Sequence, residues 1–288
     1  MHEVKKKGVR DDITVWRGDP ESGIEYRRGT AVSEPYPRHW HDEYQLCLVT
    51  EGGGALNYRG SRYETPASSL FIVHPGEIHS NHTATGCSFR SIYIKPDLIQ
   101  QIAYEIGLAG PEPPFFADTI VFDAATIANF VSLHRASEGA TPELEVEYLL
   151  RRFLLRLMEL SAKRISRQQG VGHEPAVVAR IREYITENHD RNISLSELEE
   201  LTGFSTFHLN RVFSRAVGVP PHEFQTQVRI AAARELIRHG STLANTAAAV
   251  GFADQSHLHR HFLRLMKVTP GDYSKASKNV QEIRSETS

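Results

Sequence analysis

The sequence predicts an α+β protein of more than one domain, with an N-terminal β-barrel followed by an all-α domain that carries two helix-turn-helix units. Short apolar segments separated by Gly and Pro turns fill the first hundred residues, a pattern typical of a barrel or sandwich. From Pro175 onward the apolar spacing is helical and a pattern repeats. A length of 288 residues also favours two domains.

Composition indicates an ordinary globular protein, with 40% hydrophobic and 24% charged residues. No apolar run approaches the roughly 20 residues of a membrane helix, and no apolar stretch follows Lys5–Lys7. We therefore expect neither a membrane span nor a secretory signal, and a cytoplasmic location. Cys47 and Cys87 are expected to be buried thiols. The net charge of −2 does not by itself indicate nucleic-acid binding, so such binding must depend on where basic residues stand.

The β-region is predicted strand by strand from its apolar runs. A strand over Glu43–Thr50 is followed by a predicted turn over Glu51–Gly54. The turn Arg59-Gly60-Ser61 predicts a hairpin between its neighbours. The remaining predicted strands are Ala55–Tyr58, Arg62–Glu64, Ser69–Val73 and Ser88–Ile94.

Two helices are predicted after the barrel, over Ala124–His134 and Pro142–Arg164. The second carries an apolar stripe that either packs on its own barrel or forms a dimer seam, and periodicity does not separate these alternatives. The stripe consists of Val146, Leu149, Leu150, Phe153, Leu157 and Leu160, widened by Leu154 and Met158. A hinge is predicted at Gln168–Gly172. These segments divide the chain into a sensing domain (1–110), a helical linker or dimerisation region (111–172) and a DNA-binding domain (173–288).

An internal repeat runs through the last domain, with its copies 48 to 49 positions apart. Leu198–Phe204 is echoed by Thr246–Phe252, and Leu209–Phe213 by Leu258–Phe262. Val219-Pro220 and Phe224 are echoed by Val268, Pro270 and Tyr273. Each copy therefore predicts two short helices joined by a Gly-Phe turn, with a helix over Phe224–His239 between the copies.

The first copy shows how each unit is built. Ser194 and Ser196 are candidate N-caps, Gly203 suits a left-handed helix end, and Phe204 is expected to fill the turn. The second helix of each unit is predicted to bury one apolar stripe and to present another stripe outward. The buried stripes are Leu209, Val212 and Phe213 in copy one, and Leu258, Phe262 and Leu265 in copy two. The outward stripes are Phe207, Asn210, Arg211 and Ser214, and Gln255, Ser256, His259 and Arg260.

A short helix, a glycine turn and a helix with outward hydrogen-bond donors form the helix-turn-helix pattern. The second helix enters the major groove, where Arg can bind guanine and Gln or Asn can bind adenine. Duplicate units can read two groove segments about 34 Å apart. The alternative for Arg211 and Arg260 is a simple solvated surface charge, which their matched positions disfavour.

These motifs resemble the AraC/XylS family of transcription regulators. The resemblance rests on Gly203-Phe204, Leu209–Phe213, Gly251–Phe262 and Val268–Tyr273. It implies a seven-helix domain with two recognition helices that binds double-stranded promoter DNA, usually for activation beside RNA polymerase. By motif position, the DNA contacts would be Phe207, Asn210, Arg211, Gln255, Ser256, His259 and Arg260. The histidine-rich run His257, His259 and His261 departs from the family and suggests mild pH dependence.

The N-terminal motifs resemble a cupin barrel of the type that such regulators use for effectors. The resemblance rests on Pro37–Gln45, a Gly-rich turn and Pro75–His79. His39 and His41, with His79 and either Gln45 or Glu43, could bind a metal. Because Gln45 stands where a cupin enzyme has Glu, we interpret the histidines as hydrogen-bonded residues of an organic-effector pocket, without a cofactor. The candidate effector-binding residues are Arg38, His39, Trp40, His41, Tyr44, His79 and Arg90.

The sequence thus predicts a homodimeric, effector-responsive transcription regulator that is an activator and not an enzyme. One alternative is a metal-binding cupin enzyme fused to a DNA-binding domain. Another is a regulator whose barrel serves only for dimerisation. The identity of the effector and the operator sequence do not follow from the sequence.

Overall fold

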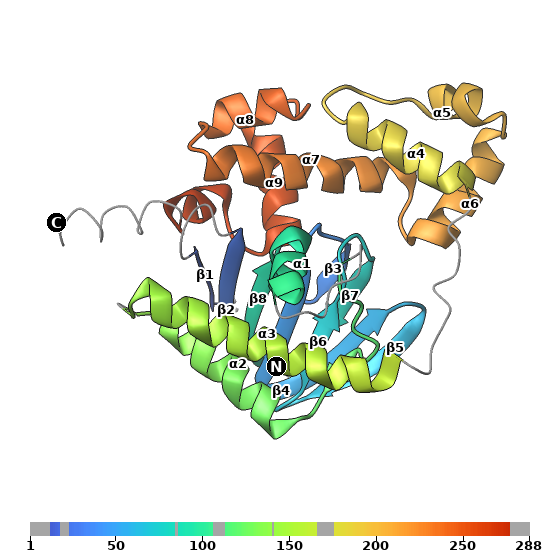
Figure 1. Ribbon diagram of the computed structural model, residues 1–288. Coiled ribbons are helices and arrows are strands. Elements are labelled where there is room, and N and C mark those ends of the chain that lie inside the picture. The colour runs from blue at the N-terminus through green and yellow to red at the C-terminus, as the bar shows by residue number, and fades with distance from the viewer. Residues whose placement is uncertain are drawn as a thin grey trace, which may run out of the picture.

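A computed structural model describes residues 12–17, 23–83, 86–105, 113–139, 141–165 and 176–276. A β-domain carries helices α1–α3 on one side, and the helical domain α4–α9 packs against another side (Figure 1). The strands are β1 Asp12–Arg17, β2 Ile24–Val32, β3 Tyr36–His39, β4 Tyr44–Tyr58, β5 Ser61–Pro66, β6 Leu70–Val73, β7 His79–His82, β8 Cys87–Ile94 and β9 Ile120–Val121. The first helices are α1 Pro96–Glu105, α2 Ala124–Ala136 and α3 Glu143–Ile165. The labelled helices of the second domain are α4 Ala176–Glu187, α5 Leu195–Thr202, α6 Thr206–Val217, α7 Pro221–Arg238, α8 Leu243–Ala249 and α9 Gln255–Met266, and residues 270–276 are helical as well.

Strand β4 belongs to both layers of the β-domain. Its first part pairs with β6 and β8, in the layer ordered β1-β2-β8-β4-β6-β9, and its second part pairs with β5 and β7. The predicted turn at Glu51–Gly54 is therefore wrong, because the chain bends there without leaving the strand. Gly52 has φ +69°, and a Cβ at Gly52 would lie 2.3 Å from the carbonyl oxygen of Gly86. Glycine lets the strand bend at this close approach.

Side chains along β4 alternate between two regions: the apolar core under the helices α1–α3, and the space between the two layers of the β-domain. Leu46 and Leu48 pack beneath α1, α2 and α3, in the largest apolar core of the described residues. Cys47 and Val49 point to the other side, into the space between the two layers. Because successive strand residues face opposite ways, one strand supplies both the helix-covered core and the lining of the interior.

The apolar stripe of α3 packs within the subunit. Leu150, Phe153 and Leu157 are buried in the same core as the sheet, and Leu160 packs against that core. Of the two alternatives, this is packing on the chain's own barrel, so the expectation of a dimer seam on this stripe is corrected. The predicted hinge at 168–172 lies outside the described residues.

The helical domain has two apolar cores that share α7. Phe224 and Val228, in the first half of α7, pack with α4, α5 and α6. Ala233 and Ile237, in the second half, pack with α8 and α9. Each half-domain therefore contains one helix-turn-helix unit, and α7 fixes their relative position. Within the described residues, no helix combines the length and apolar character needed to cross a bilayer.

Candidate DNA-binding face and ligand site

The first helix-turn-helix unit consists of α5 and α6. Ser194 caps α5 in a capping box with Glu197, and Gly203 ends that helix at φ 74°, as the sequence predicts. Leu209 and Phe213 of α6 are buried. Phe204, expected to fill the turn, is instead 40% exposed and stacks on His208 of α6. His208 belongs to the recognition helix of the same unit, and the 40% exposure of Phe204 leaves this turn largely in solvent.

The second unit consists of α8 and α9 and has a closed turn. Thr242 caps α8, and Asp254 caps α9 by accepting a 2.7 Å hydrogen bond from the backbone N–H of His257. Phe252 is only 5% exposed and stacks on His261, with the guanidinium of Arg229 on α7 above its ring. Helix α7 thus supplies the cover that the first turn lacks.

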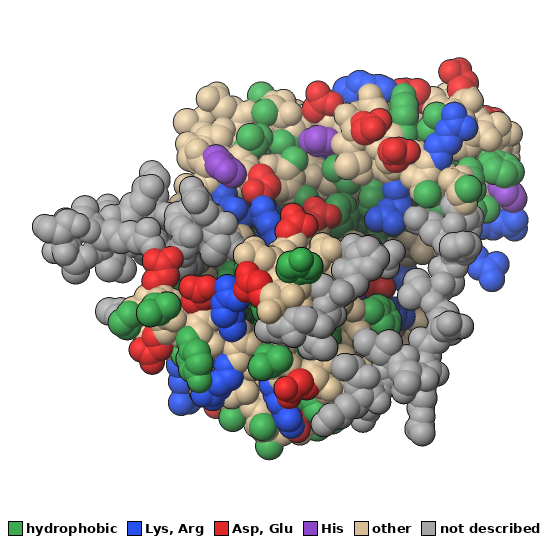
Figure 2. Space-filling model, viewed as in Figure 1, with side chains coloured by type: hydrophobic (Ala, Val, Ile, Leu, Met, Phe, Trp, Pro, Cys, Tyr) green, Lys and Arg blue, Asp and Glu red, His purple; other side chains and the backbone are tan. Residues whose placement is uncertain are grey.

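The sequence-predicted DNA contacts lie on the outer face of the recognition helices α6 and α9. Those whose side chains are described are all exposed: Asn210, Arg211, Gln255, Ser256, His259 and Arg260. The side chain of Phe207 lies outside the described part of the chain. On the face drawn in Figure 2, acidic and basic side chains are interspersed, without one basic patch.

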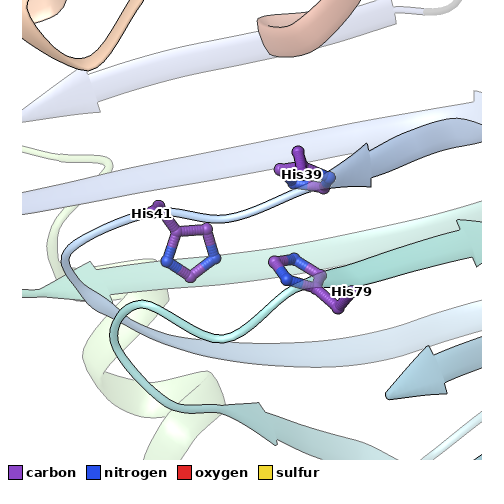
Figure 3. Close-up of side chains that lie close together, drawn as sticks. All are labelled: His39, His41 and His79. Atoms are coloured by element: carbon purple, nitrogen blue, oxygen red, sulfur yellow. The ribbon is translucent and has the colours of Figure 1, made fainter. Parts of the chain in front are cut away.

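Three histidines meet in the β-domain. His39 ends β3, His41 follows it, and His79 begins β7 directly opposite His39. The ring of His79 lies 4.2 Å from that of His39 and 4.9 Å from that of His41, centroid to centroid. Figure 3 shows the three rings around a common point. One nitrogen from each lies within 4.8 Å of the others.

The environment keeps these rings neutral at pH 7. Burial, together with His41, lowers the pKa of His39 to about 3. Burial also lowers the pKa of His41, and burial with both neighbouring rings lowers that of His79 well below its ordinary value. A cationic imidazole in this cluster would lose its hydration and face its neighbours at short range. The cluster therefore offers lone pairs and N–H groups rather than positive charge.

A cavity beside the histidines occupies the interior between the two layers. His39, Gln45, Asn81 and Tyr93 supply polar groups, and the apolar part of the lining includes Val49, Phe71 and Phe89. The side-chain oxygen of Asn81 is buried and has no hydrogen-bond partner among the described residues. Sequence reasoning missed Asn81 and Tyr93. The alternation of strands β7 and β8 was the signal that could have identified them.

The other predicted effector residues do not join the histidines. The backbone carbonyl of Arg38 accepts a 3.1 Å hydrogen bond from Gln227 of α7, and Trp40 stacks on Phe224 at 5.4 Å. Both therefore lie at the contact with the helical domain. Tyr44 lies in the helix-covered core and donates to the carbonyl of Pro114. Arg90 pairs with Glu138 at 2.5 Å, beside α2.

Residues 34–43, here called the coupling segment, contact both the cavity and the helical domain. Tyr36 and His39 line the cavity. Glu34 pairs with Lys267 after α9 at 3.2 Å, and Trp40 packs on α7. Near the other recognition helix, Arg38 approaches Gly218 at the end of α6. A shift of this segment would therefore change its contacts at the C-terminal ends of both recognition helices, α6 and α9.

A buried ionic cluster fixes the same contact. Arg234 of α7 pairs with Glu43 at 2.9 Å and lies 3.8 Å from Glu25, which accepts a 2.7 Å hydrogen bond from Tyr273. Burial alone would raise the pKa of Glu25, but Arg27, Arg234 and Arg17 hold it well below its ordinary value. Sequence reasoning missed this cluster. The charged pair Glu25 and Arg27, two positions apart in a strand, could have indicated it.

Comparison with known proteins finds a matching family model in each half of the chain. A family model described as "AraC-like ligand binding domain" matches residues 21–154, and one described as "Helix-turn-helix domain" matches residues 198–276. The chain is 28% identical over 252 residues to the uncharacterized HTH-type transcriptional regulator YbfI of Bacillus subtilis, covering 87% of this chain and 91% of YbfI. It is 22% identical to the HTH-type transcriptional activator RhaS of an Enterobacter species, covering 82% and 86% of the two chains.

Among solved structures, apo ToxT from Vibrio cholerae has the same fold. The likeness covers 94% of this chain and 99% of the ToxT chain, with a TM-score of 0.57 and 14% identity. ToxT has also been solved with an unsaturated fatty acid bound, at a TM-score of 0.52.

Proposed function

The chain belongs to the AraC family of DNA-binding transcription regulators with an N-terminal ligand-binding domain, and from that premise we propose that a small molecule in the barrel cavity controls how α6 and α9 reach promoter DNA. The observation that carries this proposal is the coupling segment, whose residues line the cavity and also contact the helical domain. Ligand can regulate only by favouring one arrangement of the two domains.

The regulator is proposed to activate transcription beside RNA polymerase in the cytoplasm, with no reaction of its own. The naming of RhaS as an activator supports this direction. The effector is proposed to contact His39, Gln45, Asn81 and Tyr93, the polar groups of the cavity lining. The DNA contacts are proposed to be the outward residues of α6 and α9.

A homodimer is proposed on a face of α3 other than the buried stripe. Leu144 is 78% exposed and Tyr148 59% exposed on this face, and Leu155 is exposed as well. Glu147 and Arg151 supply both signs of charge beside them, which suits a self-complementary two-fold contact. Sedimentation of the parent protein should show a dimer at micromolar concentration, and Tyr148→Lys should shift it toward monomer. A parent protein of monomer mass would contradict the proposal.

The test of effector control uses the full-length protein. Genomic fragments that it binds are sequenced to find its operator, and small molecules are screened by thermal shift. A stabilising molecule should change operator affinity by roughly 5- to 150-fold, the usual range of allosteric coupling. A molecule that stabilises the protein and leaves operator affinity unchanged would contradict control through this cavity.

Variants at the contact between the β-domain and the helical domain test whether the buried ionic cluster transmits the effector response. Glu43→Gln should keep DNA binding and lose most of the effector response, because Arg234 then loses its closest carboxylate. Lys95→Ala is the matched control, since its 3.9 Å pair with Glu235 also joins the two domains but is exposed. A full response in Glu43→Gln would exclude the cluster as the transmitting contact.

A further inference from the structure

The residue that ends the second recognition helix is unusual for its position. Lys267 follows α9 at φ 59°, in the left-handed region, and its backbone N–H donates to the carbonyl oxygen of Leu263. Gly218 holds the equivalent place after α6, at φ 88°, and a valine follows in both copies of the repeat. Glycine is the usual residue there, because a Cβ disfavours this conformation. Within the described ranges, Lys267 is the one non-glycine residue that ends a helix at positive φ.

The side chain of Lys267 is also held in an unusual way. It is only 12% exposed, whereas lysine is rarely buried in a folded protein. Its ammonium pairs with Glu34 at 3.2 Å and lies 5.9 Å from the centre of the Tyr36 ring. A lysine held in this way loses side-chain freedom in addition to the cost of its backbone conformation. Such costs at one residue persist only where the surrounding structure imposes them, and they often mark a functional position.

The end of α9 is connected to the cavity lining through two neighbouring residues. Both partners of Lys267 are lining residues of the cavity. The residue before it, Met266, has a sulfur that lies 4.0 Å from a guanidinium nitrogen of Arg27. That guanidinium lies 4.4 Å from the centre of the Tyr93 ring, and Tyr93 also lines the cavity. A change in the cavity lining therefore has a short route to the end of α9.

The first recognition helix meets the coupling segment differently. A Cβ at Gly218 would lie 2.9 Å from a guanidinium nitrogen of Arg38 and 3.1 Å from Cγ2 of Ile78. The β-domain thus reaches the end of α6 closely, and α6 offers no side chain of its own at this point. At α9 the direction is reversed, because Lys267 supplies the connecting side chain. One substitution can therefore remove the contact at α9 without crowding the backbone.

We propose that Lys267 is a positioning residue, which ties the end of α9 to the cavity lining through Glu34 and Tyr36. The side chain of Glu34 is 72% exposed, and an ion pair so close to water is weak enough to exchange. A ligand that moves either partner would change how α9 is held, and DNA that moves α9 would change the cavity lining in return. The first consequence rests on the proposed function, whereas the second needs no ligand.

The test measures the second consequence, on full-length protein with its own operator and no small molecule. Hydrogen exchange at the amides of Tyr36, Arg38 and His39 in β3 is compared with and without saturating operator DNA. In the parent protein we expect DNA to change these exchange rates by about 5-fold or more, the lower end of usual allosteric coupling. Lys267→Gly should lose this change and still fold, because glycine suits φ 59°.

Three further variants separate positioning from a merely structural role. Lys267→Arg should keep the DNA-dependent change, because arginine retains the charge on a long side chain, whereas a simple helix end would favour glycine over both. Glu34→Gln should reduce the change, since it removes the charge of the partner. The matched control is Lys275→Ala, which removes a 76% exposed lysine from the same domain and should respond as the parent does.

The outcomes distinguish this proposal from the proposed function. A full DNA-dependent change in Lys267→Gly, or its loss in Lys267→Arg as well, would overturn the role of Lys267. A parent protein whose β3 amides do not respond to the operator would overturn it too. The proposed function is decided separately, by the effect of a stabilising small molecule on operator affinity. If that effect survives in Lys267→Gly, control through the cavity stands and uses another contact between the domains.

Discussion

The two helix-turn-helix units share one sequence pattern but differ in how firmly their turns are held. In the first, Phe204 is exposed and a Cβ at Gly203 would meet no atom within 4 Å. In the second, Phe252 is buried, and Gly251 lies against the chain at Asp190. The repeat therefore specifies the fold of each unit, while the surrounding helices decide its rigidity.

This difference suggests that the two recognition helices differ in how firmly they are held before they bind DNA. Helix α9 is capped by Asp254 and held beneath Arg229 through Phe252. Helix α6 begins at Thr206, and its N-cap residue Ser205 makes no side-chain cap hydrogen bond. A firmly held helix loses less conformational freedom on binding, so α9 should be the better organised reader and α6 the more adaptable one.

The largest expected difference concerns the turn phenylalanines. Phe252→Ala should lower the free energy of unfolding by about 3–5 kcal/mol, because it empties a buried aromatic site. Phe204→Ala should change it by less than about 0.5 kcal/mol, as is usual for an exposed position. Chemical denaturation of the two variants measures this, and equal losses would show that both turns are packed alike.

The turn glycines should differ in the same direction. Gly203→Ala places a side chain at φ +74°, which costs about 1–2 kcal/mol. Gly251→Ala adds a clash, since its Cβ would lie 2.2 Å from the carbonyl oxygen of Asp190. We expect Gly251→Ala to be clearly the more destabilising in thermal unfolding. If Gly203→Ala were as damaging, the first turn would have to be constrained as well.

Local features of these units were readable from sequence because short-range chemistry decides them. The cap at Ser194 and the left-handed end at Gly203 depend on residues within one turn of the helix. The burial of Phe252 and the exposure of Phe204 depend on α7, whose placement no local pattern contains. The bend of β4 at Gly52 was missed for the same reason, since pairing with distant strands decides it.

The candidate sites were predictable to a similar extent. The spacing of His39 and His41 identified the cluster, and the structure brings His79 to it. Strand alternation would have separated His39 from its neighbours Arg38 and Trp40, which contact the helical domain. The pair of Glu43 with Arg234 spans 191 positions, and one sequence without structure offers no signal for such a contact.

The arginines of the two recognition helices, Arg211 and Arg260, allow the two units to be compared in DNA binding. Arg211→Ala and Arg260→Ala should each cost roughly 1–3 kcal/mol of specific binding if each reads a base. Anisotropy titrations at fixed salt on the identified operator measure this, with a scrambled sequence as control. A larger loss for Arg260→Ala would fit the firmer hold on α9. Unchanged affinity in both folded variants would remove these residues from the interface.

The smallest expected effect concerns the two N-caps of the recognition helices. Asp254 accepts a hydrogen bond from the backbone of His257, and its carboxylate also complements the positive end of the α9 dipole. Asp254→Ala should therefore lower the free energy of unfolding by about 1 kcal/mol. Ser205→Ala should have almost no effect, because Ser205 makes no side-chain cap bond to α6. Hydrogen exchange of the first-turn amides resolves so small a difference, with faster exchange expected only at the start of α9. Equal acceleration at both helix starts would mean that Ser205 caps α6 in solution, and the asymmetry between the two units would then rest on their turns alone.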